Sequence, residues 1–231
     1  MQPQYIVILI CSNVEWKALL KIINYTDLKQ SPYGEYFMID EGPSYNIIYF
    51  NTGCGKVNAG GGTQYVCDRW NPELIINLGT CGGFEGLVKV GDILLVNETA
   101  IYDISEELGE KDETRKHYRT IVDISWIKNR EILSNYKKCI IISADKDIDP
   151  EETENLNKEY KAIAADWESG SIAHIAEKNK TKCLILRGVS DIVGKNKAEM
   201  YGNNKLFEER SAQIMKKILK SKLMLNLDYI F

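Results

Sequence analysis

Acidic residues follow several of the short apolar runs in this sequence. Glu15 comes just after the first run, Glu168 stands where a later run turns into a helical pattern, and Asp191 ends another run. Thr80 takes the equivalent place after a fourth run. Because the carboxyl ends of parallel strands meet at one edge of a sheet, we expect these four side chains to share a cleft. Carboxyl groups in one cleft can divide the work of general acid and general base, since their surroundings set different pKa values.

Two glycine-rich segments also follow strand-like runs. Residues 79–83 read Gly-Thr-Cys-Gly-Gly, and three glycines in five positions allow a small molecule to approach the backbone closely. Residues 52–60 lead into a helical pattern, where backbone N–H groups could face an anion or a polar ligand. They lack the spacing of a phosphate-binding P-loop, so a tight turn between strand and helix is the favoured interpretation.

Each candidate residue also has a purely structural interpretation. Glu168 could interact with the positive end of a helix, while Trp167 fills the core. Arg187 and Asp191 could form an ion pair or a helix cap. Cys81 is interpreted as a buried thiol rather than a nucleophile, because no histidine stands in a recognisable partner motif. The convergence of four strand ends favours a functional site over these separate explanations.

The elements that must position these residues alternate between strand-length apolar runs and longer helical patterns. This alternation predicts an α/β fold, with a central mixed, mostly parallel sheet flanked by helices. About eight strands are expected, over residues 5–10, 36–40, 46–50, 74–78, 92–97, 140–143, 162–166 and 183–188. Helices are expected from residue 14 and over residues 56–70, 168–178 and 206–223. No linker or internal repeat interrupts the pattern, so residues 1–231 are expected to form one domain.

Two stretches, residues 103–117 and 145–161, are rich in charge and poor in apolar residues. We interpret them as solvated loops that each hold at most a short surface helix. Since both leave the carboxyl side of expected strands, parts of them could also line the cleft.

Composition excludes several classes of protein. The chain has 231 residues, of which 44% are hydrophobic and 27% charged, and its net charge is −4. Such a mildly acidic chain is poorly suited to binding nucleic acid, and its first apolar run of seven residues is too short to cross a membrane. Six cysteines without a Cys-x-x-Cys pair, together with two histidines, indicate reduced thiols in the cytoplasm rather than a metal site.

Four motifs, in their order and spacing, resemble the nucleoside phosphorylase and nucleosidase superfamily, and most of all its 5'-methylthioadenosine/S-adenosylhomocysteine nucleosidases. They are Gly-Cys-Gly-Lys-Val-Asn-Ala at residues 53–59, Asn-Leu-Gly-Thr-Cys-Gly-Gly at 77–83 with Val-Lys-Val-Gly-Asp at 88–92, Asp-Trp-Glu-Ser-Gly-Ser-Ile-Ala at 166–173, and Arg-Gly-Val-Ser-Asp at 187–191. The resemblance covers most of the chain. It implies a nucleoside phosphorylase-like fold, hydrolysis of the N-glycosidic bond of a purine nucleoside, no metal or organic cofactor, and a homodimer.

The resemblance also implies roles for individual residues. Asp191 would protonate the leaving purine at N7, and Glu15 would activate the attacking water. Glu168 would accept hydrogen bonds from the ribose hydroxyls and place negative charge near the oxocarbenium ion. The other implied substrate-binding residues are Thr80 and Arg187 near the water, Cys81 and Gly82 in the base-pocket wall, Ser190 beside Asp191, Trp167 on the sugar, and Ile148, whose backbone would read the purine edge.

Two positions depart from the family pattern, and two other functions stay open. Asp147 stands where an aromatic residue commonly stacks on the purine, and Trp167 stands where methionine is usual. These departures suggest an altered substrate, or a nucleoside-binding protein without catalysis. A phosphate-dependent phosphorylase is the other alternative. The chain has no arginine before Arg69 to form the family's Gly-x-x-x-Arg phosphate loop, which favours water as the nucleophile.

Overall fold

The computed structural model describes residues 4–40, 45–106, 108, 111–195 and 197–225, which form an α/β fold around one sheet. The strands are β1 (Gln4–Ile10), β2 (Lys29–Gln30), β3 (Glu35–Asp40), β4 (Tyr45–Asn51), β5 (Leu74–Phe84), β6 (Ile93–Ile101), β7 (Arg119–Ile121), β8 (Lys137–Ser143), β9 (Ala162–Asp166), β10 (Lys182–Gly194) and β11 (Lys197–Ala198). The helices are α1 (Asn13–Ile23), α2 (Lys56–Trp70), α3 (Lys111–His117), α4 (Arg130–Leu133), α5 (Thr153–Tyr160), α6 (Ser169–Lys178), α7 (Asn204–Leu219) and α8 (Lys222–Leu225).

Five strands of the sheet close into a ring. β5 pairs with β10, β10 with β6, β6 with β8, β8 with β9, and β9 returns to β5. The remaining strands extend from β5 in the order β1, β4, β3 and β2. On one side of β5, residues 74–77 pair with β1 and residues 82–83 pair with β9. Among the described residues no strand pairs with residues 78–81 on that side, so the sheet opens at the carboxyl end of β1.

The eight expected strands are all present in a mixed sheet, and the α/β fold class is confirmed. The longest ladders, β5–β10, β1–β4 and β6–β8, are parallel, and the expected hairpin is the antiparallel pair β3–β4. The sequence does not predict β2, β7 or β11, because strands of two or three residues are too short to show a period. The charged stretches 103–117 and 145–161 hold the short helices α3 and α5.

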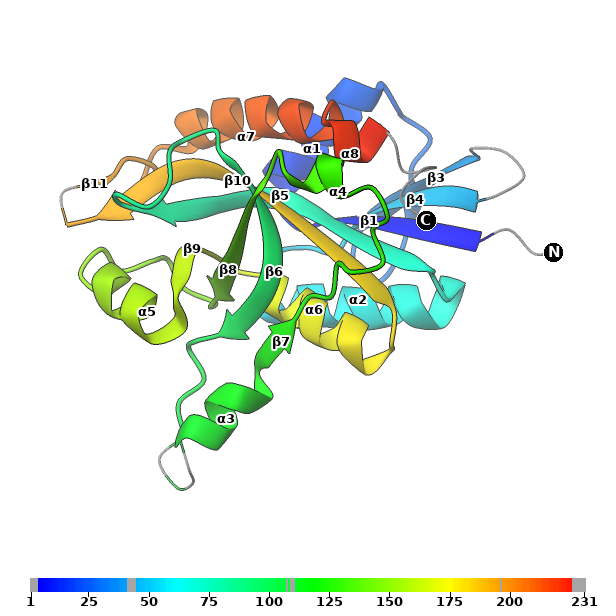
Figure 1. Ribbon diagram of the computed structural model, residues 1–231. Coiled ribbons are helices and arrows are strands. Elements are labelled where there is room, and N and C mark those ends of the chain that lie inside the picture. Colours follow the sequence, from blue (N-terminus) through cyan, green and yellow to red (C-terminus); the bar gives the residue numbers. More distant parts are fainter. Residues whose placement is uncertain (1–3, 41–44, 107, 109–110, 196, 226–231) are drawn as a thin grey trace.

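Helices cover both faces of the sheet (Figure 1). α1, α7 and α8 lie together on one face, while α2 and α6 contact each other on the opposite face. α1 begins at Asn13 because the Ser12 side chain accepts the Val14 N–H at 3.2 Å, and it ends at Asn24 in the left-handed conformation. This cap places Glu15 in the first turn of α1, directly after β1.

The central strands bury almost every side chain that they carry. Residues 6–10 of β1 and 74–76 of β5 are apolar and at most 1% exposed, as expected for parallel strands covered on both faces. Arg187 in the middle of β10 is charged, yet it is also only 1% exposed. Because a buried guanidinium needs charged and hydrogen-bonding partners, this part of β10 must serve more than packing.

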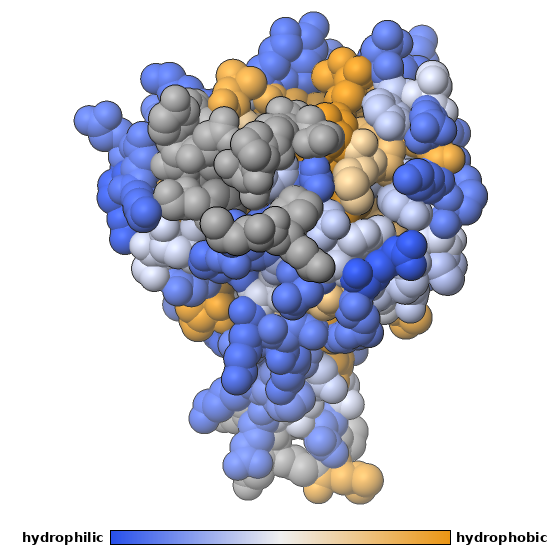
Figure 2. Space-filling view, turned by 90° about the vertical axis from the view of Figure 1, so that its right-hand side faces the viewer, coloured by the Kyte–Doolittle hydropathy of each residue, from blue (hydrophilic) through white to orange (hydrophobic). Residues whose placement is uncertain are grey.

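The end of β6, α3 and β7 form a projection from the body of the molecule (Figure 1). Figure 2 shows that this projection, at the bottom of the view, is covered mainly by hydrophilic residues. No helix in the described part of the chain is long and apolar enough to cross a membrane.

Candidate active site

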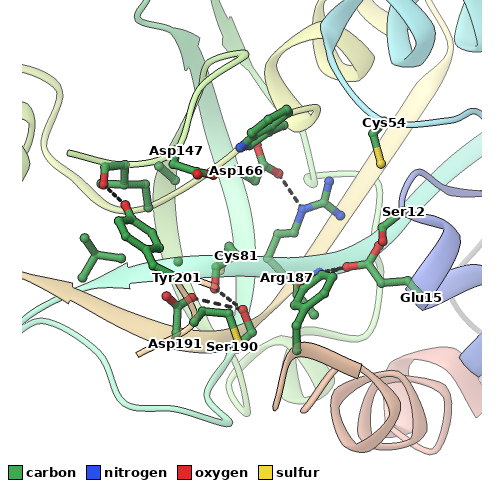
Figure 3. Close-up of a pocket in the computed structure, with 18 of the residues that line it drawn as sticks. Ser12, Glu15, Cys54, Cys81, Asp147, Asp166, Arg187, Ser190, Asp191 and Tyr201 are labelled. Atoms are coloured by element: carbon green, nitrogen blue, oxygen red, sulfur yellow. Dashed lines mark hydrogen bonds and ion pairs between the residues drawn. The ribbon is translucent and has the colours of Figure 1, made fainter. Parts of the chain in front are cut away.

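The residues expected at the site all line one cavity of about 420 Å³, which lies where the sheet opens beside β5. They come from five regions that are far apart in the sequence, and Figure 3 shows several of them around the hollow. The expected residues that line it are Glu15, Thr80, Cys81, Gly82, Ile148, Trp167, Glu168, Arg187, Ser190 and Asp191.

Glu15 lies beside residues 78–81 of β5, where no described strand pairs with this edge. Its Oε1 accepts hydrogen bonds from the backbone N–H of Thr80 at 2.6 Å and from the Thr80 hydroxyl at 2.7 Å. Burial raises the pKa of Glu15, while the Arg187 charge and the two bonds from Thr80 oppose that rise. A side chain at Gly79 would place its Cβ 2.9 Å from Arg187 Nη1 and 3.1 Å from Glu15 Oε2, so the close approach requires glycine.

Arg187 lines the cavity and is held from two sides. Its Nε donates to Asp166 Oδ2 at 2.6 Å, and its Nη2 donates to the side-chain oxygen of Asn77. Nη1 has no hydrogen-bond partner within the described residues. Figure 3 shows the guanidinium between Asp166 and Glu15, and Nη1 is buried there.

Asp166 anchors the corner between β9 and α6. It accepts hydrogen bonds from the Ser143 hydroxyl at 2.6 Å, from the Ser169 hydroxyl, and from the backbone N–H groups that begin α6. Both oxygens of the Asp166 carboxylate therefore accept bonds from neighbouring groups, and one of them also pairs with Arg187. Asp166 thus holds these neighbours in position. Trp167, the next residue, is 39% exposed and lines the cavity, which excludes the core-filling interpretation.

Glu168 faces the N-terminus of α2. Its Oε1 accepts the Gly55 N–H at 2.9 Å, and Asp145 accepts the neighbouring Lys56 N–H at 2.8 Å. The backbone N–H groups of this turn therefore bind carboxylates of the chain itself, and positive φ angles at Gly53 and Gly55 form the tight turn. Burial and the charge of Asp166 raise the pKa of Glu168 to about 8.

Asp191 is 6% exposed, and among the described residues it accepts one weak hydrogen bond, from the Ser190 hydroxyl at 3.3 Å. Burial raises the pKa of Asp191. The Ser190 hydroxyl also lies 3.2 Å from the Cys81 carbonyl oxygen. Burial raises the pKa of the Cys81 thiol well above its usual value, so this thiol stays protonated and agrees with the interpretation as a buried side chain.

The sequence analysis missed the residues that close the other end of the cavity. The Tyr201 hydroxyl donates to the Ile148 carbonyl oxygen, which ties the segment before α7 to the loop after β8 (Figure 3). Tyr201 is 47% exposed and its ring lines the cavity with Met200 and Phe207. A tyrosine before glycine in a polar segment, following a site strand, is the signal that could have indicated this wall.

The cavity is strongly acidic. Five carboxyl groups line it, from Glu15, Asp147, Asp166, Glu168 and Asp191, whereas Arg187 is the one lysine or arginine among the described lining residues. Such a surface repels anions and stabilises positive charge that develops on a bound molecule. Glu15 and Asp191 are both buried but differ in their partners, because Glu15 accepts two close bonds from Thr80 and Asp191 accepts a long one from Ser190. Different surroundings are what paired acid and base chemistry requires.

The family model described as the phosphorylase superfamily matches residues 5–221. A 5'-methylthioadenosine/S-adenosylhomocysteine nucleosidase of Buchnera aphidicola is 27% identical over 210 residues, which cover 83% of this chain and 87% of the relative. The corresponding nucleosidase of Bacillus subtilis is 26% identical over 170 residues, which cover 69% and 74%.

Solved structures show the same fold. The Helicobacter pylori 5'-methylthioadenosine/S-adenosylhomocysteine nucleosidase with butyl-thio-DADMe-Immucillin-A superposes with a TM-score of 0.80 at 20% identity, covering 98% of this chain and 100% of the other. The futalosine hydrolase of the same organism also gives 0.80, at 23% identity, covering 97% and 98%.

Proposed function

Because this chain belongs to the phosphorylase superfamily, we propose that it is a purine nucleosidase, which hydrolyses the N-glycosidic bond and releases the free base. The observation that carries the proposal is the gathering of Glu15, Glu168 and Asp191 around one cavity. The matching relatives are 5'-methylthioadenosine/S-adenosylhomocysteine nucleosidases, so the proposed substrates are nucleosides of that type.

The proposed reaction uses two carboxyls at opposite stages of protonation. Asp191, whose pKa burial raises, donates its proton to the purine N7 as the bond between C1' and N9 breaks. Glu15, held by Thr80, takes a proton from the water whose oxygen forms the new bond to C1'. The free Nη1 of Arg187 lies beside Glu15 and would hold this water.

Glu168 and Trp167 would bind the sugar. The Glu168 carboxylate, fixed by the Gly55 N–H, presents its other oxygen as an acceptor for ribose hydroxyls. Because burial raises the pKa of Glu168 to about 8, this group carries its full negative charge above that pH, where it would stabilise the oxocarbenium ion that forms as the base departs. Trp167 offers an exposed aromatic face in the same region, where it can pack on the sugar.

The charges in and around the cavity favour water over phosphate as the nucleophile. Arg187 is already bound to Asp166 and Asn77, so a phosphate would meet few free donors and several carboxyls. Lys56, which follows Gly55 in the chain, is paired with Asp103 and lies 3.8 Å from an Asp145 oxygen. A dianion would therefore be repelled, while a neutral water would not.

We also propose that two copies of the chain form a homodimer in the cytoplasm. The exposed rings of Trp167 and Tyr201 at the cavity are apolar surface that a second copy could cover. All six cysteines are free thiols and five of them are buried, as suits a reducing compartment.

The proposed function is tested with a panel of purified nucleosides. Methylthioadenosine, S-adenosylhomocysteine, adenosine, inosine and uridine are incubated with the protein, with and without phosphate, and the released base is measured by chromatography. We expect adenine from the first two at the same rate in both conditions. Base release that requires phosphate, with ribose 1-phosphate as product, would assign the protein to the phosphorylases. Tight binding without any base release would indicate a binding protein.

A further inference from the structure

An irregularity in β10 determines where the Asp191 side chain points. The pairing of β10 with β5 shifts register between Val189 and Asp191, which leaves Ser190 as the extra residue of a β-bulge. Neighbouring residues of a regular strand point to opposite faces, yet Ser190 and Asp191 both line the cavity. The bulge therefore turns the Asp191 carboxyl into the site.

A bulge leaves backbone groups that need new partners, and α7 supplies one. Arg210 Nη1 donates to the carbonyl oxygen of Ser190, the bulged residue, at 2.8 Å. Arg210 Nη2 donates to Glu199 Oε2 at 2.9 Å, and this glutamate lies in the segment between β11 and α7. One guanidinium thus joins the bulge, the helix and the segment that carries Tyr201.

We propose that Arg210 and Glu199 are positioning residues for Asp191. The guanidinium fixes the bulge that aims the carboxyl, and the Glu199 carboxylate offsets the positive charge that this brings close to it. The inference rests on the proposed function, in which Asp191 is the general acid.

The surroundings of Asp191 contain charges of both signs. Burial raises its pKa, the Ser190 hydroxyl and the Arg210 charge lower it, and the charges of Glu199 and Asp147 raise it. The other titratable groups that face Asp191 are the Tyr201 hydroxyl and the Cys81 thiol. A general acid works only below its pKa, so Arg210 and Glu199 act in opposite directions on the pH at which activity falls.

The test removes each charge separately and follows kcat/KM against pH. Glu199→Gln leaves the Arg210 charge uncompensated, lowers the pKa of Asp191, and should move the alkaline limb to lower pH by about half a unit. Arg210→Gln removes the positive charge and should move the same limb to higher pH. Arg210→Lys keeps the charge, but an ammonium group cannot bond the Ser190 carbonyl oxygen and Glu199 in the planar geometry of the guanidinium. We therefore expect kcat to fall while the alkaline limb stays in place.

A matched control removes a carboxyl from a different exposed ion pair. Glu154 bonds Lys195 at 3.0 Å, and Glu154→Gln should leave the limb unchanged. The effect of Glu199→Gln should shrink at high salt, because its pair with Arg210 is partly exposed. The proposal would be overturned if the alkaline limb of kcat/KM did not move in Glu199→Gln and Arg210→Gln, or if it moved in the same direction in both.

A second readout needs no turnover. The Asp191 carboxyl carbon is titrated by ¹³C NMR, with the resonance assigned by its loss in Asp191→Asn, and should show the same opposite shifts in the two variants. If the wild-type protein releases no base from any nucleoside, the proposed function fails, while this titration still decides whether the pair controls Asp191. Thermal unfolding of each variant identifies any that does not fold.

Discussion

At the scale of single residues, the site depends on carboxyls that share a cavity but differ in their partners. Within the described part of the chain, Glu15 accepts two close bonds from Thr80, Glu168 accepts one from a backbone N–H, and Asp191 accepts one weak bond. Asp166 accepts bonds from Arg187 and from the backbone at the start of α6. Burial raises the pKa of Glu15, Glu168 and Asp191, and the bonds that each accepts oppose this rise, since a bond to a carboxylate stabilises the charged form.

The raised pKa of Glu168 predicts a pH-dependent stability. Its pKa is about 8 in the folded state and about 4.3 in an unfolded chain, so the folded state binds more protons between these values. This contribution to stability is present at pH 4 and is lost as pH rises through 8. Because glutamine cannot ionise, the Tm of Glu168→Gln should fall less between pH 5 and 8.5 than that of the wild type, by a few degrees.

Differential scanning calorimetry over this pH range measures the difference. Glu208→Gln, at an exposed position of α7, serves as the control for losing one carboxyl. Parallel Tm curves for Glu168→Gln and the wild type would show that Glu168 does not hold its proton in the folded protein.

At the scale of elements, β5 is the strand around which the site is built. It pairs with β1 at its start, with β9 near its end and with β10 along its length. The gap between the first two is filled by the Glu15 carboxylate, which accepts the Thr80 N–H that a strand would otherwise bind. Glycine at position 79 makes room for this carboxylate and for Arg187.

Substituting Gly79 tests this arrangement. The new Cβ of Gly79→Ala would lie 2.9 Å from Arg187 Nη1 and displace it or Glu15, so we expect a loss of about 1–3 kcal/mol in stability. Turnover should fall roughly a hundredfold, because a shift of about 1 Å at reacting groups has that effect. Denaturant unfolding and base release measure the two changes.

Gly60→Ala is the matched control in α2. Its Cβ would lie 3.8 Å from Ile175 and Ser171, an ordinary contact, and alanine should stabilise the helix by about 1 kcal/mol without changing turnover. Full activity in Gly79→Ala would show that Arg187 and Glu15 need not occupy the observed positions.

At the scale of the whole molecule, ring closure brings distant segments to one cavity. β5, β9 and β10 meet at the site, and β1 delivers α1 from the open side. The cavity still exposes Trp167 and Tyr201 at its opening, which is where a partner chain would complete it.

The proposed homodimer predicts a concentration-dependent activity. Sedimentation at micromolar concentration should give a mass of about twice 26.3 kDa. If the second copy completes the site, activity per chain should fall on dilution below the dissociation constant of the dimer, because the sugar end would then open to solvent. A monomer with full activity at micromolar concentration would contradict the homodimer.

By itself the sequence determined the α/β class, the eight longer strands and the ten expected residues that line the cavity. The class, the strands and the shared cleft of Glu15, Thr80, Glu168 and Asp191 follow from local patterns, namely the lengths of apolar runs, the glycine spacing and the polar residues that follow the runs. The other six residues were implied by the resemblance to the superfamily. The chemical roles of the ten residues are proposals that the experiments above address.

Only the tertiary structure decided how the sheet closes into a ring, that β10 carries a bulge, and which groups complete the site. The bond from Gly55 to Glu168 joins residues 113 positions apart, and those from Tyr201 to Ile148 and from Arg210 to Ser190 span 53 and 20 positions. The physical reason is that strand register and long-range side-chain contacts come from packing across the whole fold, which no local period specifies.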